Sequence, residues 1–230
     1  VEVFAQSVMT TFFPTLSHYF AKNMMAEMKK THVSGLSMLL LVMIPSSSIL
    51  IFYSTDIVGI LLERGSFTSE DTVSTAIVVS CLSIGIIGRS ISYYNFRMFH
   101  ALSMSWKQVK LGIFQLLMNA SLNAVLIVSL GLNGVALATS ISLSITAIIT
   151  IILLQKYLES LIFNKLKNSV IKIIIMTSLL LITLKLWSIL FFSSSVEVKD
   201  TQGYIISLLG VIPGLLVFYI SGLFLRLNEI

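Results

Sequence analysis

Long apolar stretches recur along the whole chain, and they constrain its fold more than any other feature. Of the 230 residues, 56% are hydrophobic and only 11% are charged, whereas roughly a quarter of residues are charged in a typical soluble domain. About 20 apolar residues are enough for a helix to cross the ~30 Å hydrocarbon core of a bilayer. Because a span must satisfy its backbone hydrogen bonds internally, the sequence predicts an all-α, polytopic transmembrane helical bundle.

The apolar stretches divide into seven segments, separated by short polar connections. The second segment is long and contains Pro45, followed by three serines. Proline removes a backbone donor, so we expect Pro45 to break this segment near mid-depth with a kink. We interpret the first segment as the latter part of a helix. We therefore interpret the chain as the C-terminal part of a longer protein. The seven expected spans are about Val1–Tyr19, Val33–Leu62, Val73–Phe96, Val109–Leu130, Gly134–Tyr157, Val170–Phe192 and Tyr204–Leu225.

Lysine and arginine are unevenly distributed between alternate connections. Eleven lie in or beside the connections on one side of the expected bundle, and only Arg64 and Lys199 lie on the other. Cytoplasmic loops carry an excess of basic residues, so we expect the larger group and the C-terminus in the cytoplasm and the loop Glu63–Thr72 outside. The eleven are Lys22, Lys29, Lys30, Arg97, Lys107, Lys110, Lys156, Lys165, Lys167, Lys172 and Arg226.

Residue types that carry catalysis or metal binding are sparse. Cys81 is the only cysteine, which excludes an intramolecular disulfide and a cysteine-based zinc cluster. The sequence contains no HExxH, GxSxG or P-loop motif, and its basic residues do not gather on a soluble face with interleaved aromatic residues. We therefore predict a transporter with no catalytic residue, metal, cofactor or nucleic-acid partner. The alternative from another class is a membrane-embedded glycosyltransferase or acyltransferase.

Four polar residues inside the expected spans form the candidate site. Gln115, Asn119 and Asn123 are four residues apart on one helix face, and Arg89 is the only arginine well inside a span. Such groups are costly against lipid and face the bundle interior or a wet cavity, and Arg and amide groups supply the donors that an anionic headgroup needs. We expect the four, in neighbouring spans, to form the polar wall of a substrate cavity. The alternatives are hydrogen bonding between helices for the amides, and snorkelling or pairing with a backbone carbonyl for Arg89.

Small residues recur every four positions in the fifth segment. Small side chains on one face let a neighbouring helix backbone approach closely. We therefore expect this face to pack against another helix. The residues are Gly134, Ala138, Ser142, Thr146 and Thr150.

Several stretches resemble motifs of one family, and their order and spacing agree over about residues 1–157. The loop E-R-G-S-F-T-S-E-D-T at Glu63–Thr72 resembles the E-R-G-x-F-T-x-x-D-T loop of the MviN/MurJ lipid II flippases. F-F-P-T-L-S at Phe12–Ser17 and R-M-F-H-A-L at Arg97–Leu102 resemble the ends of that family's eighth and tenth helices. Met118-Asn119, followed by L-G-L-N-G-V-A-L-A-T-S at Leu130–Ser140, resembles the junction of its eleventh and twelfth helices.

This resemblance implies the C-terminal half of a fourteen-helix transporter. Residues 1–157 would be a transporter lobe, from the end of helix eight to helix twelve, and residues 158–230 would add two C-terminal transmembrane helices. Such proteins move a lipid-linked peptidoglycan precursor from the inner to the outer leaflet of the bacterial inner membrane by alternating access. The implied partners are that lipid-linked cell-wall precursor, membrane lipids and the missing N-terminal lobe.

The sequence departs from the family pattern at one connection. After R-x-F-Y-A-L the family has a D-T-x-T-P turn, whereas this chain has S-M-S-W-K-Q at Ser103–Gln108. The aspartate and the proline are both missing. A polysaccharide-unit flippase or a drug/cation antiporter of the same superfamily, the multidrug/oligosaccharidyl-lipid/polysaccharide exporters, therefore stays open as an alternative.

Overall fold

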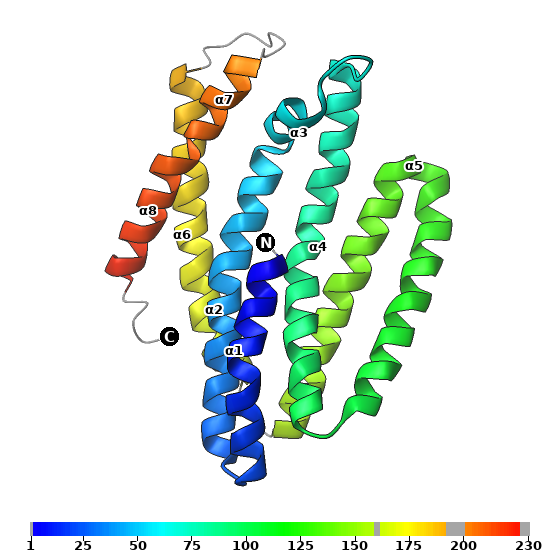
Figure 1. Ribbon diagram of the computed structural model, residues 1–230, viewed down its shortest axis with the longest axis vertical. Helices are drawn as coiled ribbons and strands as arrows, with labels where there is room; N and C mark the ends of the chain where they lie inside the picture. Colours follow the sequence, from blue (N-terminus) through cyan, green and yellow to red (C-terminus); the bar gives the residue numbers. More distant parts are fainter. Residues whose placement is uncertain (1, 159–161, 192–200, 226–230) are drawn as a thin grey trace.

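The computed structural model describes residues 2–158, 162–191 and 201–225, and all regular secondary structure within these ranges is helical. Figure 1 shows the helices side by side in one elongated bundle, which confirms the predicted all-α architecture. The eight helices are α1 (Glu2–Ala21), α2 (Met25–Phe52), α3 (Ser54–Leu62), α4 (Ser69–Ala101), α5 (Ser105–Leu158), α6 (Ile162–Phe191), α7 (Thr201–Leu209) and α8 (Val211–Phe224).

Helix α5 consists of two antiparallel arms. The chain reverses at Gly131, which has φ 57° and ψ −137°, a positive φ that glycine adopts without the steric cost of a side chain. We call residues 105–130 the first arm and residues 132–158 the second arm. With α5 counted as two spans, α3 joined to α2, and α8 joined to α7, the helices correspond to the seven predicted segments. Five described helical stretches, α5 among them, are long and apolar enough to cross a membrane.

Pro45 does not break the helix, and the kink expected there stays a prediction. Helix α2 runs unbroken through Pro45, and the interruption falls at Tyr53, between α2 and α3. Pro45 costs the helix one backbone hydrogen bond, but α2 is held close to α4 beside it, because the Ser47 hydroxyl donates to the carbonyl of Ser83. Packing against a neighbouring helix therefore outweighs the local cost of the proline.

The small-residue face of the second arm is buried, as predicted. Ala138, Ser142, Thr146 and Thr150 are each fully buried. Asn95 of α4 donates a hydrogen bond from Nδ2 to Thr150 Oγ1 at 2.9 Å, and the second arm packs along α4 over much of its length (Figure 1). The close fit of α4 against the second arm thus positions the whole α5 hairpin.

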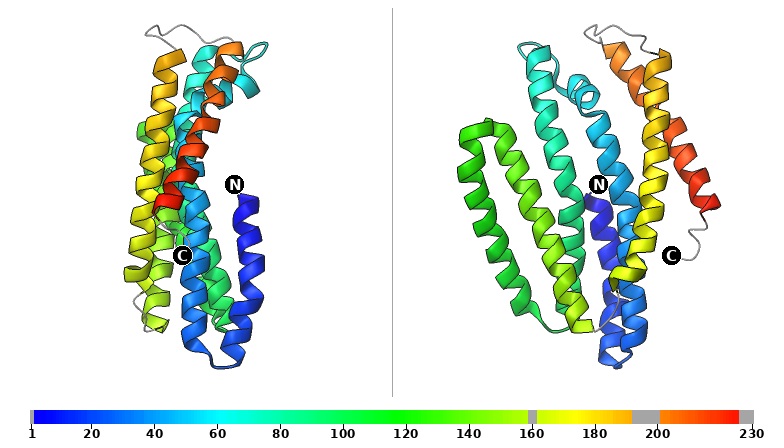
Figure 2. Two further views of the ribbon diagram at one scale, coloured as in Figure 1. Left: turned by 90° about the vertical axis from the view of Figure 1, so that its left-hand side faces the viewer. Right: turned by 180° about the vertical axis from the view of Figure 1, so that it is seen from behind.

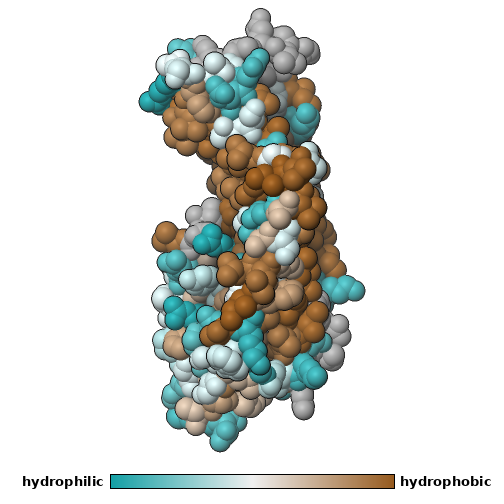
Figure 3. Space-filling model, turned by 90° about the vertical axis from the view of Figure 1, so that its right-hand side faces the viewer, coloured by the Kyte–Doolittle hydropathy of each residue, from teal (hydrophilic) through white to brown (hydrophobic). Residues whose placement is uncertain are grey.

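The connections between the helices alternate between the two ends of the bundle. The connections between α1 and α2 and between α4 and α5 lie at one end, whereas the α3–α4 loop and the turn at Gly131 lie at the other (Figures 1 and 2). Figure 3 shows a hydrophobic surface over the upper middle and right side of this face, with hydrophilic residues at both ends and along the left side of the lower half. This is the surface of a helical membrane protein. Lys199 and Arg226 lie outside the described residues.

Candidate functional site

Arg89 lies on an exposed face of α4, near helix α1. It lines a pocket of about 50 Å³ between α1 and α4, together with Ala5, Gln6, Met9, Ser90 and Tyr93. That volume holds a few water molecules but is far below the ~300 Å³ of a pocket that encloses a small ligand. The pocket is therefore a shallow recess and not an enclosed binding site. We call the surface that α1 and α4 form around it the wall.

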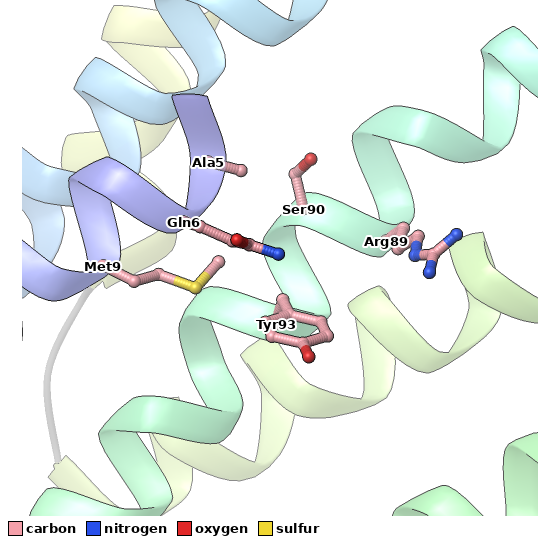
Figure 4. Close-up of a pocket in the computed structure, with 6 residues that line it drawn as sticks. All are labelled: Ala5, Gln6, Met9, Arg89, Ser90 and Tyr93. Carbon is pink, nitrogen blue, oxygen red and sulfur yellow. The ribbon is translucent and has the colours of Figure 1, made fainter. Parts of the chain in front are cut away.

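Three polar side chains give this wall its chemistry. Figure 4 shows the Gln6 carboxamide reaching from α1 toward Ser90 and Tyr93 of α4, while the Arg89 guanidinium turns away from Gln6. Gln6, Arg89 and Tyr93 are all exposed. A guanidinium, a carboxamide and a phenol together can donate several hydrogen bonds to phosphate or hydroxyl oxygens.

Gln6 belongs to a polar stripe along α1. The hydroxyls of Ser7, Thr10 and Thr11 are exposed and donate to backbone carbonyls of their own helix, Ser7 to Val3 and the two threonines to Ser7. These bonds leave the hydroxyl oxygens able to accept hydrogen bonds from outside the helix. The exposed face of α1 is thus a polar surface continuous with the Arg89 pocket.

The predicted amides lie in a different interface. Asn119 on the first arm donates from Nδ2 to Ser142 Oγ at 3.1 Å and to Thr139 Oγ1 at 3.3 Å, both on the second arm. Asn123 Nδ2 donates to Asn119 Oδ1 at 2.9 Å, and Gln115 is half-buried one turn away. These bonds join the two arms of α5, as the alternative of hydrogen bonding between helices expects.

The spans that carry Arg89 and the amides are not neighbours over most of their length. The second arm stands between them (Figures 1 and 2). Its residue Ser144 lies against Gly88 of α4, whereas Thr139 and Ser142 face the first arm. The two spans are thus separated by the second arm, because a hairpin returns that arm to the preceding helix, and a shared cavity wall of Arg89 with the amides stays a prediction.

The loop Glu63–Thr72 joins α3 to α4 through a well-defined hydrogen-bond network. Thr68 and Asp71 form a capping box at the start of α4, in which Thr68 N donates to Asp71 Oδ2 at 2.9 Å and Asp71 N donates to Thr68 Oγ1 at 3.3 Å. Gly65 turns the chain with φ 61°. The F-T-x-x-D part of the motif thus stabilises a helix N-terminus.

Glu63 accepts three hydrogen bonds from side chains. Ser69 donates to Oε1 at 2.9 Å, Thr72 to Oε2 at 2.8 Å, and Tyr204 of α7 to Oε2 at 2.9 Å. Hydrogen bonds to the ionised form, from Thr72 first and then Tyr204 and Ser69, hold the pKa of the Glu63 carboxyl below its ordinary value. Sequence reasoning missed the role of Tyr204, which is 141 residues away and carries no local signal. It also missed Gln6, although a glutamine inside an apolar segment is itself a signal.

These features define a polytopic α-helical membrane protein with a polar wall on one side. The family model for the lipid II flippase MurJ matches residues 1–199, and the chain belongs to that family. This confirms the resemblance that the sequence motifs carry.

The known proteins that this chain resembles include probable lipid II flippases. A probable lipid II flippase MurJ from Buchnera aphidicola is 31% identical over 158 residues, which cover 69% of this chain and 30% of that protein. One from Rickettsia prowazekii is 27% identical over 142 residues, covering 62% and 28%. A probable low-salt glycan biosynthesis flippase, Agl15, from Haloferax volcanii is 26% identical over 147 residues, covering 64% and 30%. The chain thus spans about 30% of the length of these relatives.

A solved structure has the same fold. It is described as lipid II flippase MurJ in an inward closed conformation, and it superimposes with a TM-score of 0.73 at 26% identity. The match covers 98% of this chain and 44% of that one. Helices from all three described ranges, 2–158, 162–191 and 201–225, therefore have counterparts in a MurJ structure.

Proposed function

We propose that this chain is the C-terminal lobe of a flippase that moves lipid II, the lipid-linked peptidoglycan precursor, from the cytoplasmic to the outer leaflet. The observation that carries the proposal is the family match over residues 1–199. The arrangement of helices in a MurJ fold supports it. The activity is transport, in which no covalent bond is made or broken.

The proposal assigns a place to each part of the chain. Residues 1–157 form the lobe, and residues 158–230 add the last two transmembrane helices. The chain works in the bacterial inner membrane with its C-terminus in the cytoplasm, as the distribution of lysine and arginine supports. An N-terminal lobe is its partner, because alternating access requires two units that rock about a central site.

Arg89, Gln6 and Tyr93 are the residues that we assign to the substrate-facing wall. A lipid-linked precursor carries phosphate and sugar oxygens, which must exchange water for donors as the headgroup crosses the membrane. A guanidinium binds phosphate oxygens in a planar, bidentate fork. The phenol of Tyr93 on the same helix and the carboxamide of Gln6 on α1 suit sugar hydroxyls. The amides of α5 hold the two arms of the hairpin together and do not contact the substrate in this proposal.

Rescue of cells depleted of their lipid II flippase tests this assignment. In the full-length parent protein, Arg89→Ala should lower flipping about tenfold or more, since a charge-assisted hydrogen bond contributes roughly 1.5–3 kcal/mol. Arg89→Lys should recover only part of it, because a point charge cannot reproduce the fork. Lys185→Ala is the matched control, since Lys185 is an exposed basic residue of another span, α6. Normal flipping by Arg89→Ala at wild-type abundance would remove Arg89 from the wall.

A second candidate function is transport of a different lipid-linked glycan. The similarity to Agl15 of Haloferax volcanii favours it, and so does the missing D-T-x-T-P turn at Ser103–Gln108. The same rescue experiment distinguishes lipid II transport from transport of a different lipid-linked glycan. A parent protein that rescues a glycan-flippase mutant, and not lipid II flippase depletion, would establish the second candidate.

A further inference from the structure

One face of α3 is built to receive α7. Asp56, Gly59 and Glu63 are spaced at i, i+3 and i+7, which places them on the same side of a helix. Tyr204 of α7 donates to Glu63 Oε2 at 2.9 Å, and Ser207, one turn later, donates to Asp56 Oδ2 at 3.2 Å. Two carboxylates of one helix thus each accept a hydroxyl from the other helix.

Gly59 lets the two helices approach between these hydrogen bonds. A Cβ atom on Gly59 would lie 2.5 Å from the ring of Tyr204, which is too close for a non-bonded contact between carbon atoms. The Tyr204 ring therefore rests directly on the α3 backbone, and only 7% of its surface is exposed. We call Asp56, Gly59, Glu63, Tyr204 and Ser207 the outer clasp.

Glu63 joins three elements at this clasp. Besides Tyr204 of α7, it accepts hydrogen bonds from Ser69 and Thr72 at the beginning of α4. Thr72 is only 1% exposed, so its hydroxyl is held in place by surrounding structure. A carboxylate that is fixed from α4 is a rigid acceptor for α7, since little side-chain freedom is left to lose when Tyr204 docks.

The last helical pair is held by two helices, and Gly214 of α8 lies close to Leu184 of α6. In the described part of the chain, α7 and α8 contact the bundle mainly through α3 and α6. Figures 1 and 2 show α8 leaning away from the bundle toward its end, where Phe224 is 84% exposed. The side-chain hydrogen bonds that hold α7 on α3 thus lie at the opposite end of the pair from Phe224.

We propose that Glu63 is the positioning residue of the outer clasp, which docks α7 onto α3 and so fixes this end of the α7–α8 pair on the lobe. This explains why the loop motif includes a glutamate before the turn and a threonine after the capping box. For its consequence in transport the inference rests on the proposed function, because α8 then belongs to the moving parts of a flippase.

Spin-label distances across the clasp test the proposal in the purified chain, reconstituted in nanodiscs with Cys81→Ala. Labels replace Leu61 of α3 and Ile205 of α7, which are both exposed. We expect one narrow distance distribution for the wild-type clasp, and a broader one with a longer mean for Glu63→Gln. The neutral amide has one acceptor oxygen for the three hydroxyls that donate to Glu63, and it loses the charge that strengthens these bonds. Glu70→Gln, an exposed acid of the same loop, should leave the distribution unchanged.

A second pair of labels separates positioning from general destabilisation. Labels at Ile77 of α4 and Ile148 of α5, both exposed, report on a seam far from α7 and should not respond to Glu63→Gln. Gly59→Ala opens the clasp sterically with both carboxylates intact, so it should lengthen the Leu61–Ile205 distance as Glu63→Gln does. An unchanged Leu61–Ile205 distribution in both variants, or an equal change at both label pairs, overturns the proposal.

The same variants in the full-length parent link the clasp to transport. Glu63→Gln should weaken the rescue of flippase-depleted cells, whereas Glu70→Gln should not. A wild-type parent that fails to rescue would overturn the flippase assignment and would leave the distance measurement untouched. The two failures are therefore distinguishable.

Discussion

Gly88 of α4 lies directly against the backbone of Ser144 in the second arm of α5. A Cβ atom on Gly88 would be 2.8 Å from both the nitrogen and the Cα of Ser144. Backbone atoms cannot swing aside as the end of a side chain can, so a larger residue at position 88 must push the two helices apart.

Gly88→Ala should therefore destabilise the protein. The cost expected for overpacking is about 1–3 kcal/mol, measured as a lower midpoint of thermal unfolding in detergent. Gly112→Ala is the matched control, because nothing lies within 4 Å of a Cβ at Gly112 in the first arm. Since alanine is preferred to glycine in a helix by roughly 0.5–1 kcal/mol, this control should be neutral or slightly stabilising. Equal losses for both variants would contradict the close packing of α4 and α5.

Asn119 should contribute to stability through the α5 hairpin. Replacing it by leucine removes its bonds to Thr139 and Ser142 and leaves Asn123 without its acceptor. Hydrogen bonds between membrane helices contribute about 0.6 kcal/mol on average and up to about 1.7, so Asn119→Leu should cost about 1–2 kcal/mol in detergent unfolding.

Gln115→Leu provides the comparison for Asn119→Leu. It lies on the same face of the first arm and is half-buried, but it is not part of the bonds that join the arms. We expect a smaller loss of stability from Gln115→Leu than from Asn119→Leu. Loss of transport in the full-length parent at normal stability would instead favour the cavity role for Asn119.

The sequence predicted the spans because hydrophobic length is a local property, and the family because the motifs keep their order. It misplaced the break in α2, since the local effect of Pro45 is visible in the sequence and the contact of Ser47 with Ser83 is not. It grouped Arg89 with Asn119 for a similar reason. Nothing in the sequence says that the second arm of α5 returns between their helices, and a contact such as Tyr204 with Glu63 depends on the whole tertiary arrangement.

The orientation of the bundle is testable by chemical labelling. A cysteine at Ser66, exposed in the α3–α4 loop, should react with an impermeant thiol reagent added outside intact cells when Cys81 is replaced by alanine. A cysteine at Lys22, exposed between α1 and α2, should react only after the membrane is opened. The reason is the excess of lysine and arginine on the Lys22 side. The opposite pattern would reverse the topology and place the C-terminus outside.

Trp187 offers an optical report on the outer clasp. Its indole Nε1 donates to the carbonyl of Ile206 in α7 at 3.1 Å, so movement of α7 changes its surroundings. With Trp106→Phe it is the only tryptophan left. Its emission in nanodiscs therefore measures whether α7 is docked on α3 as the pH changes.

Acidification should release the clasp through Glu63. Its pKa lies below the ordinary value of 4.5 because the ionised carboxylate accepts hydrogen bonds from Thr72, Tyr204 and Ser69. A group whose pKa is lowered by folding stabilises the folded arrangement above its unfolded pKa, and this contribution is lost as the pH falls through the folded value. Trp187 emission should stay constant from neutral pH to about 4.5 and shift to the red below it. The charged and titratable groups around Glu63 are Asp56 and Arg64 beside it, Glu70 and Asp71 of α4, and Tyr204 of α7.

Variants assign this transition to one carboxylate. In Glu63→Gln the emission should already be shifted at neutral pH, and the acid-induced change should be smaller than in the wild type, because no carboxylate remains there to protonate. Glu70→Gln should keep the wild-type curve, since its side chain is exposed and is not part of the bonds to α7. A full acid-induced change of Trp187 emission in Glu63→Gln would contradict the role given to Glu63.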